Sequence, residues 1–237
     1  MEYKRKIMRL RNDLLEGIAM AMNDSNNEAV WYLDVQKEET VFISEYYAED
    51  EEMLEMIEND YGEERFIAIP ARSSHEGWEQ MERFILTLDD QDEKTRNLLL
   101  TTLQGPGAFG RFKEAVHRIG LQERWYVFKG REDRKDVLDW LYSLDLITTD
   151  DIDKGMQLYE ELLAKRRQRE AGIARMTRGA WVKCIENIGH EAQLTPGKTY
   201  EVLDERKEHR NIRLRDDRGN VRWYPKSHFE LISLRKA

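Results

Sequence analysis

The sequence predicts an α+β protein: a mostly helical N-terminal domain with a small antiparallel sheet, plus a C-terminal small all-β barrel. Two observations support this class. Apolar residues recur at helical spacing through much of residues 1–147, and short β-branched and aromatic runs separated by turn residues fill residues 176–237. The polar stretch between them, residues 148–175, predicts a helical linker. We therefore expect an α+β domain, a linker and a small barrel.

The N-terminal domain is expected to begin with an amphipathic helix over residues 5–23, where leucine, isoleucine and methionine recur every three or four positions. The runs EAVWYLDV and ETVFIS follow, and they predict a hairpin connected by QKE. Asp34, near the end of the first run, is expected to face water. The acidic run of residues 48–60 predicts a short helix, and RFIAIP, which stops at Pro70, predicts a third strand.

From residue 73 to about residue 147 the pattern is helical. The run SSHEGWEQMERFILTL offers Ser73 or Ser74 as the helix N-cap, with Glu76 or Gly77 three residues further on. EKTRNLLLTTL, RFKEAVHRIG and RWYVFKGREDRKDVLDWLYSLDLI continue the helical block. The linker carries KRRQR near its end, which suits the dipole at a helix C-terminus; contact with nucleic acid is the alternative.

The C-terminal part contains five short β-type runs: GAWVKCIE, KTYEVLDE, NIRLRDD, VRWYPKS and FELIS. Turn signals divide them at TPG, HRN and DDRGN. Short strands so close together in the sequence predict a small barrel or an open antiparallel sheet.

Residues 105–110 read GPGAFG, which matches the pattern G-x-G-x-x-G of nucleotide-phosphate loops. A dinucleotide site needs a strand directly before the glycines, but the preceding TRNLLLTTLQ is spaced as a helix. Pro106 lacks one of the amides that such a loop presents, and no Gly-Lys-Ser or Gly-Lys-Thr follows. The segment is therefore interpreted as a turn between two helices.

In this interpretation Gly105 is the N-cap of the second helix and Pro106 is its first residue. One face of that helix then carries the residues expected in the core, Phe109, Phe112, Val116 and Ile119. Gly110 lies inside the helix, where glycine costs about 1 kcal/mol relative to alanine. A close helix crossing or a partner contact would explain its presence.

Several segments of the N-terminal domain match together in order: YLDV, RFIAIP, SSHEGWEQMERFI, GPGAFGRFKEAV and RWYVFKGRE. They resemble the bacterial Uncharacterised Protein Family 0158 over about residues 10–147, which implies a small α+β domain of bacterial origin and no particular activity. The tail, with LTPGKTYEVLDE and NIRLRDDRGNVRWYPKSHFEL, is similar to small Src-homology-3-like barrels. This similarity implies binding of peptides or nucleic acids, or docking within the same chain.

No catalytic set, metal site or cofactor is predicted. The histidines lack metal-ligand spacing: His75, His117, His190, His209 and His228. Cys184 is the single cysteine, which excludes an internal disulfide, fits a reducing cytoplasm and is expected to be buried. Asp13 and Glu16 interrupt the apolar part of the N-terminus, which argues against a signal peptide. No segment approaches the roughly 20 apolar residues of a membrane span, so we expect a cytoplasmic protein without membrane contact.

The net charge of −9 is unevenly distributed. Residues 1–104 hold 11 Lys or Arg against 25 Asp or Glu, residues 105–135 hold 8 against 4, and residues 176–237 hold 13 against 9. An anionic partner would therefore be repelled by the first half of the chain. The basic regions supply the candidate partner-binding residues: Arg111, Lys113, Arg118, Arg124, Trp125, Lys129, Arg213, Arg215, Arg222, Trp223, Tyr224 and Lys226.

A structural interpretation of residues 105–135 competes with this one and is preferred: Trp125 and Phe128 belong to the core, and the basic residues pair with the acidic N-terminal half. The sequence as a whole predicts a bacterial cytoplasmic non-enzymatic binding or adaptor protein with a protein partner. The alternative is a nucleic-acid-binding regulator that uses residues 105–135 and the barrel. An enzyme acting on a nucleotide rests only on GPGAFG and ranks third.

Overall fold

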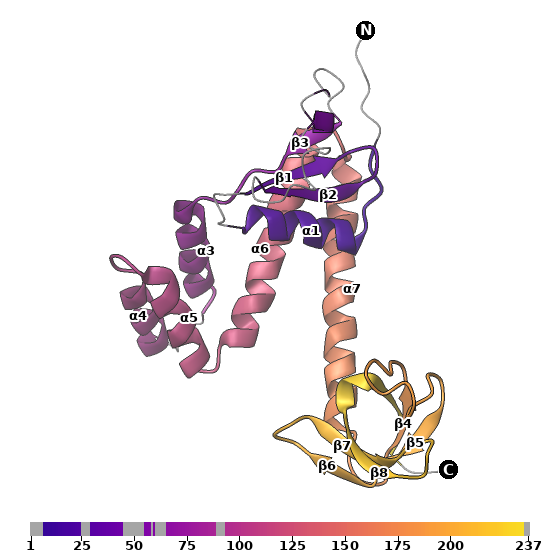
Figure 1. Ribbon diagram of the computed structural model, residues 1–237. Coiled ribbons are helices and arrows are strands. Elements are labelled where there is room, and N and C mark those ends of the chain that lie inside the picture. The colour runs from indigo at the N-terminus through magenta and orange to yellow at the C-terminus, as the bar shows by residue number, and fades with distance from the viewer. Residues whose placement is uncertain are drawn as a thin grey trace. The chain divides into compact units, whose positions relative to one another are not determined.

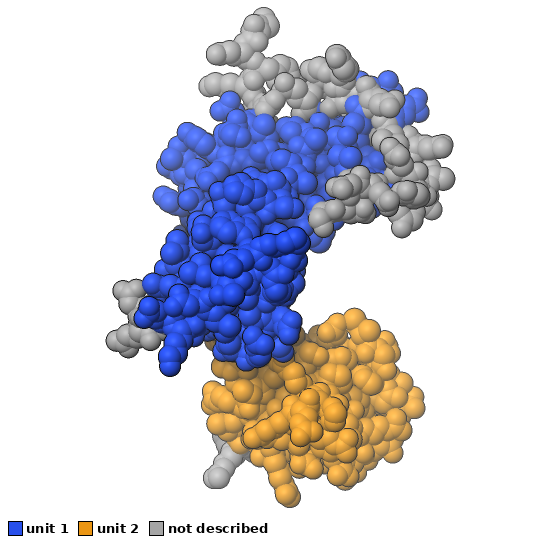
Figure 2. All heavy atoms as spheres, turned by 90° about the vertical axis from the view of Figure 1, so that its left-hand side faces the viewer, with its two compact units in different colours: residues 1–160 blue, residues 161–237 orange. Residues whose placement is uncertain are grey.

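The chain divides into two compact units, residues 1–160 and 161–237, called unit 1 and unit 2 below (Figure 2). The computed structural model describes residues 7–24, 29–44, 55–57, 59, 65–88 and 93–234. The predicted α+β class is confirmed, and most of unit 1 is helical. Within the described ranges, no helix is both long and apolar enough to cross a membrane. The predicted acidic helix of residues 48–60 lies largely outside these ranges.

The sheet of unit 1 is the predicted hairpin with one added strand. β1 (Ala29–Asp34) pairs antiparallel with β2 (Glu39–Ser44), and β3 (Phe66–Ala68) pairs antiparallel with the other edge of β1. Helix α1 (Asn12–Met22) lies next to this sheet (Figure 1). The hairpin and the third strand therefore form as their alternating and β-branched residues predict.

Two predictions in this region are wrong. The first helix begins at Asn12 rather than near residue 5: its N-cap Arg11 is extended, and the Met8 amide donates to the Leu146 carbonyl at 2.8 Å. Asp34 does not face water, because it is buried and its carboxylate pairs with Arg65 at 2.7 Å. Burial raises the pKa of Asp34, but hydrogen bonds from Arg65 and nearby backbone amides outweigh it and hold the pKa below its usual value.

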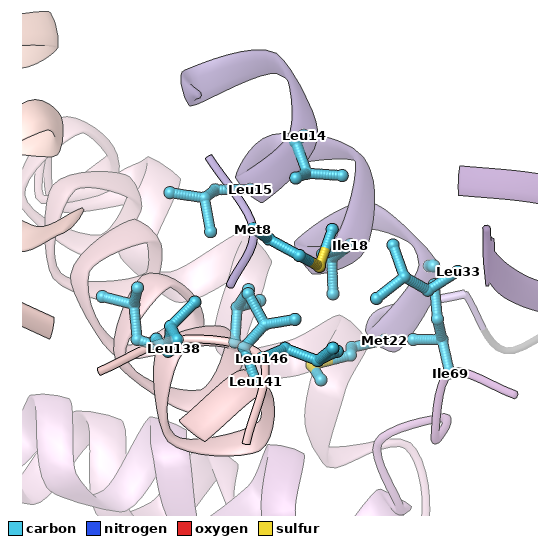
Figure 3. Packing of buried hydrophobic residues seen from close by; sticks show 13 residues of the cluster. Met8, Leu14, Leu15, Ile18, Met22, Leu33, Ile69, Leu138, Leu141 and Leu146 are labelled. Atoms are coloured by element: carbon cyan, nitrogen blue, oxygen red, sulfur yellow. The ribbon is translucent and has the colours of Figure 1, made fainter. Parts of the chain in front are cut away.

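The first core of unit 1 lies between α1, the sheet and helix α6 (Gln122–Ser143). Leucine, isoleucine and methionine side chains of α1 point toward the leucines of α6 in Figure 3. Its buried members are Met8, Leu14, Leu15, Ile18, Ala21, Met22, Leu33, Ile69, Val137, Leu138, Leu141, Leu146 and Ile147. Burial of these apolar side chains is the main force that holds the sheet to the helices.

A second core joins α3 (Ser74–Leu86), α4 (Glu93–Thr102), α5 (Ala108–Arg118) and part of α6. The predicted N-cap of α3 is Ser73, which forms a capping box: its Oγ accepts from the Glu76 amide, and Glu76 accepts from the Ser73 amide at 2.7 Å. An aromatic cluster fills this core, with the Phe84, Phe112 and Trp125 rings in edge-to-face contact.

Helix α7 (Thr149–Ala174) occupies the predicted linker, and the boundary between the two units falls inside it at residue 160. Its first part packs closely on α6 at two glycines. A Cβ on Gly130 would lie 1.9 Å from the Tyr159 Oη, and a Cβ on Gly155 would lie 2.5 Å from a methyl carbon of Leu138. These glycines permit the close helix crossing that the sequence suggested at Gly110, where a Cβ would have no heavy atom within 4 Å.

Unit 2 contains two three-stranded antiparallel sheets, with strand orders β5-β4-β9 and β6-β7-β8. The strands are β4 (Trp181–Cys184), β5 (Thr199–Glu201), β6 (Asp204–Arg206), β7 (Asn211–Arg215), β8 (Val221–Pro225) and β9 (Phe229–Ser233), and the 3-10 helix η3 (Lys226–His228) precedes β9. Both sheets contribute to one core, which includes Val182, Ile212, Leu214 and Phe229. Cys184 is buried in it, as predicted.

The predicted closed barrel is not observed, because the strand pairing leaves two open sheets. The run KTYEVLDE, expected as one strand, is divided into β5 and β6. Leu203 lies at the division, and its amide donates to the Arg213 carbonyl of the second sheet at 2.7 Å. The chain therefore passes from one sheet to the other within this run, which explains why it does not continue as a single strand.

Candidate partner-binding surface

The glycine-rich segment is a turn between two helices, as predicted, but its helix begins later. α4 ends at Thr102 and α5 begins at Ala108. Gly105 and Gly107 have φ angles of 72° and 78°, a conformation that glycine adopts far more readily than other residues. Gly107 is therefore the N-cap, in place of Gly105, and Pro106 lies in the turn rather than in the helix.

Arg111 folds back onto this turn. Its guanidinium donates to the backbone carbonyls of Gln104, Gly105 and Pro106. A phosphate loop presents N–H groups to an anion, whereas this turn directs carbonyl oxygens toward a cation. The arrangement is therefore opposite in polarity to a nucleotide-phosphate site, and Arg111 has an intramolecular role.

The helical face predicted for the core is only partly buried. Phe112 and Val116 are buried, whereas Phe109 is 40% exposed and lies beside Gly77, where a Cβ would come within 2.9 Å of its ring. The Phe109 prediction is therefore wrong: the ring covers a glycine of α3 at the surface of unit 1.

Most of the basic segment 105–135 is occupied by contacts within unit 1. Arg124 donates to the Thr87 carbonyl at 2.7 Å, and Lys129 contacts the Asp133 carboxylate at 2.5 Å. Trp125 is buried in the aromatic cluster, so it cannot serve as a contact residue. Of the six candidates in this segment, Lys113 and Arg118 alone have exposed side chains that make no ion pair or hydrogen bond within the described ranges. The burial of Trp125 therefore fits the preferred structural interpretation, but Arg111, Arg124 and Lys129 contact backbone carbonyls, Asn23 and Asp133 rather than carboxylates of the acidic N-terminal half.

A buried polar network centres on Asp133 of α6. Its carboxylate accepts hydrogen bonds from Arg72 at 2.6 Å, Gln80 at 2.9 Å, Lys129 at 2.5 Å and Asn23 at 3.1 Å. Burial raises the pKa of Asp133, but the hydrogen bonds from Lys129, Gln80 and Arg72 outweigh it, so the pKa lies below its usual value. The network connects the end of α1, the β3–α3 connection, α3 and α6.

Asp136, three residues further along α6, also pairs with Arg72. Burial raises its pKa, Arg72 opposes this effect, and the negative charges of Asp133 and Glu132 add to it, so the pKa lies above its usual value. Neither carboxylate was predicted from the sequence, because their partners are distant in the chain. The i,i+4 pair of Lys129 and Asp133 was the single local signal.

The two units differ strongly in charge. Residues 1–160 hold 20 Lys or Arg against 36 Asp or Glu, a balance of −16, and residues 161–237 hold 18 against 11, a balance of +7. An anionic partner is therefore favoured by unit 2 and disfavoured by unit 1.

The outer face of the β6-β7-β8 sheet carries three arginines and one tryptophan; Arg206 and Arg213 lie beside the tryptophan, and Arg215 donates to the Gly219 carbonyl at 2.7 Å. We call Arg206, Arg213, Arg215 and Trp223 the Arg–Trp face. In the strand register Arg213 lies opposite Trp223, and the Arg206 and Arg213 guanidinium carbons lie 4.3 Å and 6.0 Å from the centre of the Trp223 indole. The three arginines are exposed and Trp223 is half-buried. Asp204, opposite Arg213 on β6, is the single carboxylate on the strand positions of this face.

Three other candidate residues do not lie on this face: Arg222, Tyr224 and Lys226. Because side chains alternate along a strand, Arg222 faces the side of the sheet opposite to Trp223. Its guanidinium lies 3.8 Å from the buried Asp216 carboxylate. Tyr224 is 1% exposed and donates to Asp216 at 3.0 Å; burial, with the Asp216 contact, raises its pKa to about 12. The predicted roles of Arg222 and Tyr224 in this surface are therefore not supported by their positions.

Lys226 is also removed from the surface, because it is 4% exposed. Its Nζ donates to the Glu205 carboxylate at 2.9 Å and to the Ile173 carbonyl at 3.2 Å. Conversely, Arg206 was not predicted, because it directly follows KTYEVLDE, which was expected to be one strand ending at Glu205, whereas β6 starts at Asp204 and includes Arg206. The strand alternation of VRWYP could have separated Trp223 from Arg222 and Tyr224.

The fold and the surfaces together define a two-unit α+β protein with an acidic helical unit and a basic β unit. The chain belongs to the Uncharacterised protein family (UPF0158), whose model matches residues 6–164. The match covers unit 1 and the first part of α7, so it extends further than the sequence resemblance suggested, and the sheets of unit 2 lie outside it. Searches of curated proteins and of solved structures found no match.

Proposed function

We propose that the chain is a non-enzymatic binding protein of the bacterial cytoplasm, and that its Arg–Trp face binds single-stranded nucleic acid. The main support for this proposal is that two guanidinium groups lie beside the Trp223 indole, with a third arginine on the same face of the sheet. Bases stack on aromatic rings and on guanidinium planes, and arginine also neutralises phosphate. The face therefore offers both contacts that an unpaired strand requires.

The charge distribution supports this choice of partner. A polyanion is attracted by the +7 of residues 161–237 and repelled by the −16 of residues 1–160. We further propose that unit 2 is a Src-homology-3-like module, because two three-stranded sheets share one core and η3 precedes the last strand. The β6-β7-β8 sheet would then be the nucleic-acid-binding sheet of that module.

Fluorescence anisotropy with labelled single-stranded RNA and DNA tests the proposal. Binding is expected at low salt, and log K should fall with log salt at a slope of about −2, because three arginines each displace about 0.7 of a counterion. Trp223→Leu should weaken binding by about fivefold to 150-fold, the range for one stacked base. Arg213→Gln should reduce the salt slope by about 0.7.

Arg222→Gln is the matched control for Arg213→Gln, because it removes the same charge from the adjacent strand β8, next to Trp223, but on the other face of the sheet. It should change the affinity much less than Arg213→Gln. Circular dichroism of each variant checks that the sheets remain folded. Absence of binding at low salt, or equal affinity of Trp223→Leu and the unaltered protein, would rule out the Arg–Trp face as a nucleic-acid site.

A further inference from the structure

A groove of about 550 Å³ in unit 2 lies between the C-terminal part of α7 and strand β9. One side comes from a single face of α7, on which Lys165, Arg169 and Gly172 recur every three or four residues, and from Arg175, which directly follows the helix. All residues that line the groove belong to unit 2, and it shares none with the Arg–Trp face.

Part of the groove lining is apolar. Met176 and Phe229 form buried parts of its lining, Leu231 is half-buried, and Ile185 is 45% exposed. Gly172 lies in the middle of the α7 side of the groove and leaves space there, because a Cβ on this residue would meet only the Leu231 Cβ at 3.9 Å. An exposed apolar lining of this kind is stabilised when a partner's apolar side chains cover it.

The rim carries positive charge that the described part of the chain leaves uncompensated. The Lys165 and Arg175 side chains are exposed and make no ion pair or hydrogen bond with described residues. Arg169 donates to the Ser227 carbonyl at 3.1 Å and has no carboxylate partner within those ranges. Glu230 is the single acidic residue in the lining. An acidic partner would therefore complement the rim.

From the apolar part of the lining and the basic rim we propose that this groove binds an acidic, amphipathic peptide segment of a protein partner. Two or three apolar side chains of the segment enter the groove, and its carboxylates pair with Lys165, Arg169 and Arg175. The helix side of the groove, from Lys165 to Arg175 just after α7, is about 15 Å long, which matches about three turns of a bound helix. Nucleic acid fits the rim, but it has no large aliphatic side chains to cover Ile185 and Leu231.

This site goes beyond the nucleic-acid function proposed above and makes the chain an adaptor with two separate surfaces. The test uses the full chain and a panel of labelled amphipathic peptides of about 15 residues, with leucine, phenylalanine or methionine anchors at i, i+3, i+4 and i+7 and glutamate elsewhere. At least one peptide should bind, and a scrambled peptide of the same composition should bind at least about tenfold more weakly.

Two variants examine the groove itself. Gly172→Leu fills it without helix strain, because the position is helical and has room for a Cβ, and it should weaken binding about tenfold or more. The double variant Lys165→Gln and Arg175→Gln should weaken binding about threefold to tenfold. Arg167→Gln is the matched control, because Arg167 is exposed on the same helix outside the groove lining and should leave the affinity within about twofold.

The outcomes separate this site from its alternatives. Failure of the whole panel to bind, or unchanged affinity of Gly172→Leu, overturns the proposal. Equal binding of the scrambled peptides reduces it to non-specific charge attraction, and loss of oligonucleotide binding in Gly172→Leu assigns the groove to nucleic acid instead. Trp223→Leu should retain peptide binding, so failure of the nucleic-acid proposal leaves the peptide result interpretable.

Discussion

Replacement of Asp133 by alanine is expected to lower the unfolding free energy of unit 1 by about 3–5 kcal/mol, the range for removal of one partner from a buried ion pair. Lys129 and Gln80 would lose their carboxylate acceptor, and Arg72 would retain Asp136 as its carboxylate partner beside the neutral Asn23 and Gln80 oxygens. The remaining positive charge would then be buried without its main partner. Denaturant unfolding followed by far-UV circular dichroism, which reports chiefly on the helices, measures the change.

The Asp133 effect should depend on pH. Because the folded-state pKa of Asp133 is lowered, its stabilisation is fully present above the unfolded value of about 3.9 and is lost as the pH falls through the folded pKa. The difference in stability between the unaltered protein and Asp133→Ala should therefore shrink in acid. The pH dependence expected for Asp136 has the opposite sign, because its folded-state pKa is raised. Its contribution to stability is lost as the pH rises through that folded-state pKa.

Glu132→Ala is the control for this prediction. It removes the same charge from the adjacent position of α6, but Glu132 pairs with Arg83 at 2.9 Å near the surface. Surface pairs of this kind contribute about 0–1 kcal/mol. Equal losses for Glu132→Ala and Asp133→Ala would show that the helix responds to net charge and that the buried network has no special role.

Local signals predicted much of the fold. The β1–β2 hairpin, the Ser73 capping box and the turn around Gly105 depend on residues close together in the sequence, and each is observed. The position at which α1 begins was missed, because it depends on the backbone contact between Met8 and Leu146. Nothing in the neighbouring sequence reports such a distant pairing.

The candidate site shows the same division. Arg213 and Trp223 were identified from composition. Arg206 lies on the Arg–Trp face because of the register of β6 with β7, which the sequence does not show. Arg111 was considered a contact residue because its acceptors are backbone carbonyls, which leave no mark in the sequence. Charge counts can therefore locate a basic region, but long-range pairing decides which of its cations are available to a partner.

Alanine at Gly130 and alanine at Gly110 are expected to have opposite effects, although both glycines lie inside helices of unit 1. At Gly110 a Cβ meets no heavy atom within 4 Å, so alanine should stabilise unit 1 by about 1 kcal/mol through helix propensity. At Gly130 the Cβ would lie 1.9 Å from the Tyr159 Oη and 2.9 Å from its Cζ. Overpacking of this kind destabilises by about 1–3 kcal/mol.

Denaturant unfolding of both alanine variants, with Tyr159→Phe alone and combined with Gly130→Ala, tests the packing. Removal of the hydroxyl should recover part of the Gly130→Ala loss, because it deletes the nearest atom, while the ring carbons still crowd the new methyl group. The Tyr159 ring also lies under Arg134, with 5.3 Å from guanidinium carbon to ring centre, so it has little freedom to move away. Helix propensity alone predicts that alanine stabilises at both positions. Stabilisation by Gly130→Ala similar to that by Gly110→Ala would therefore mean that α7 does not pack on α6 at this glycine in solution.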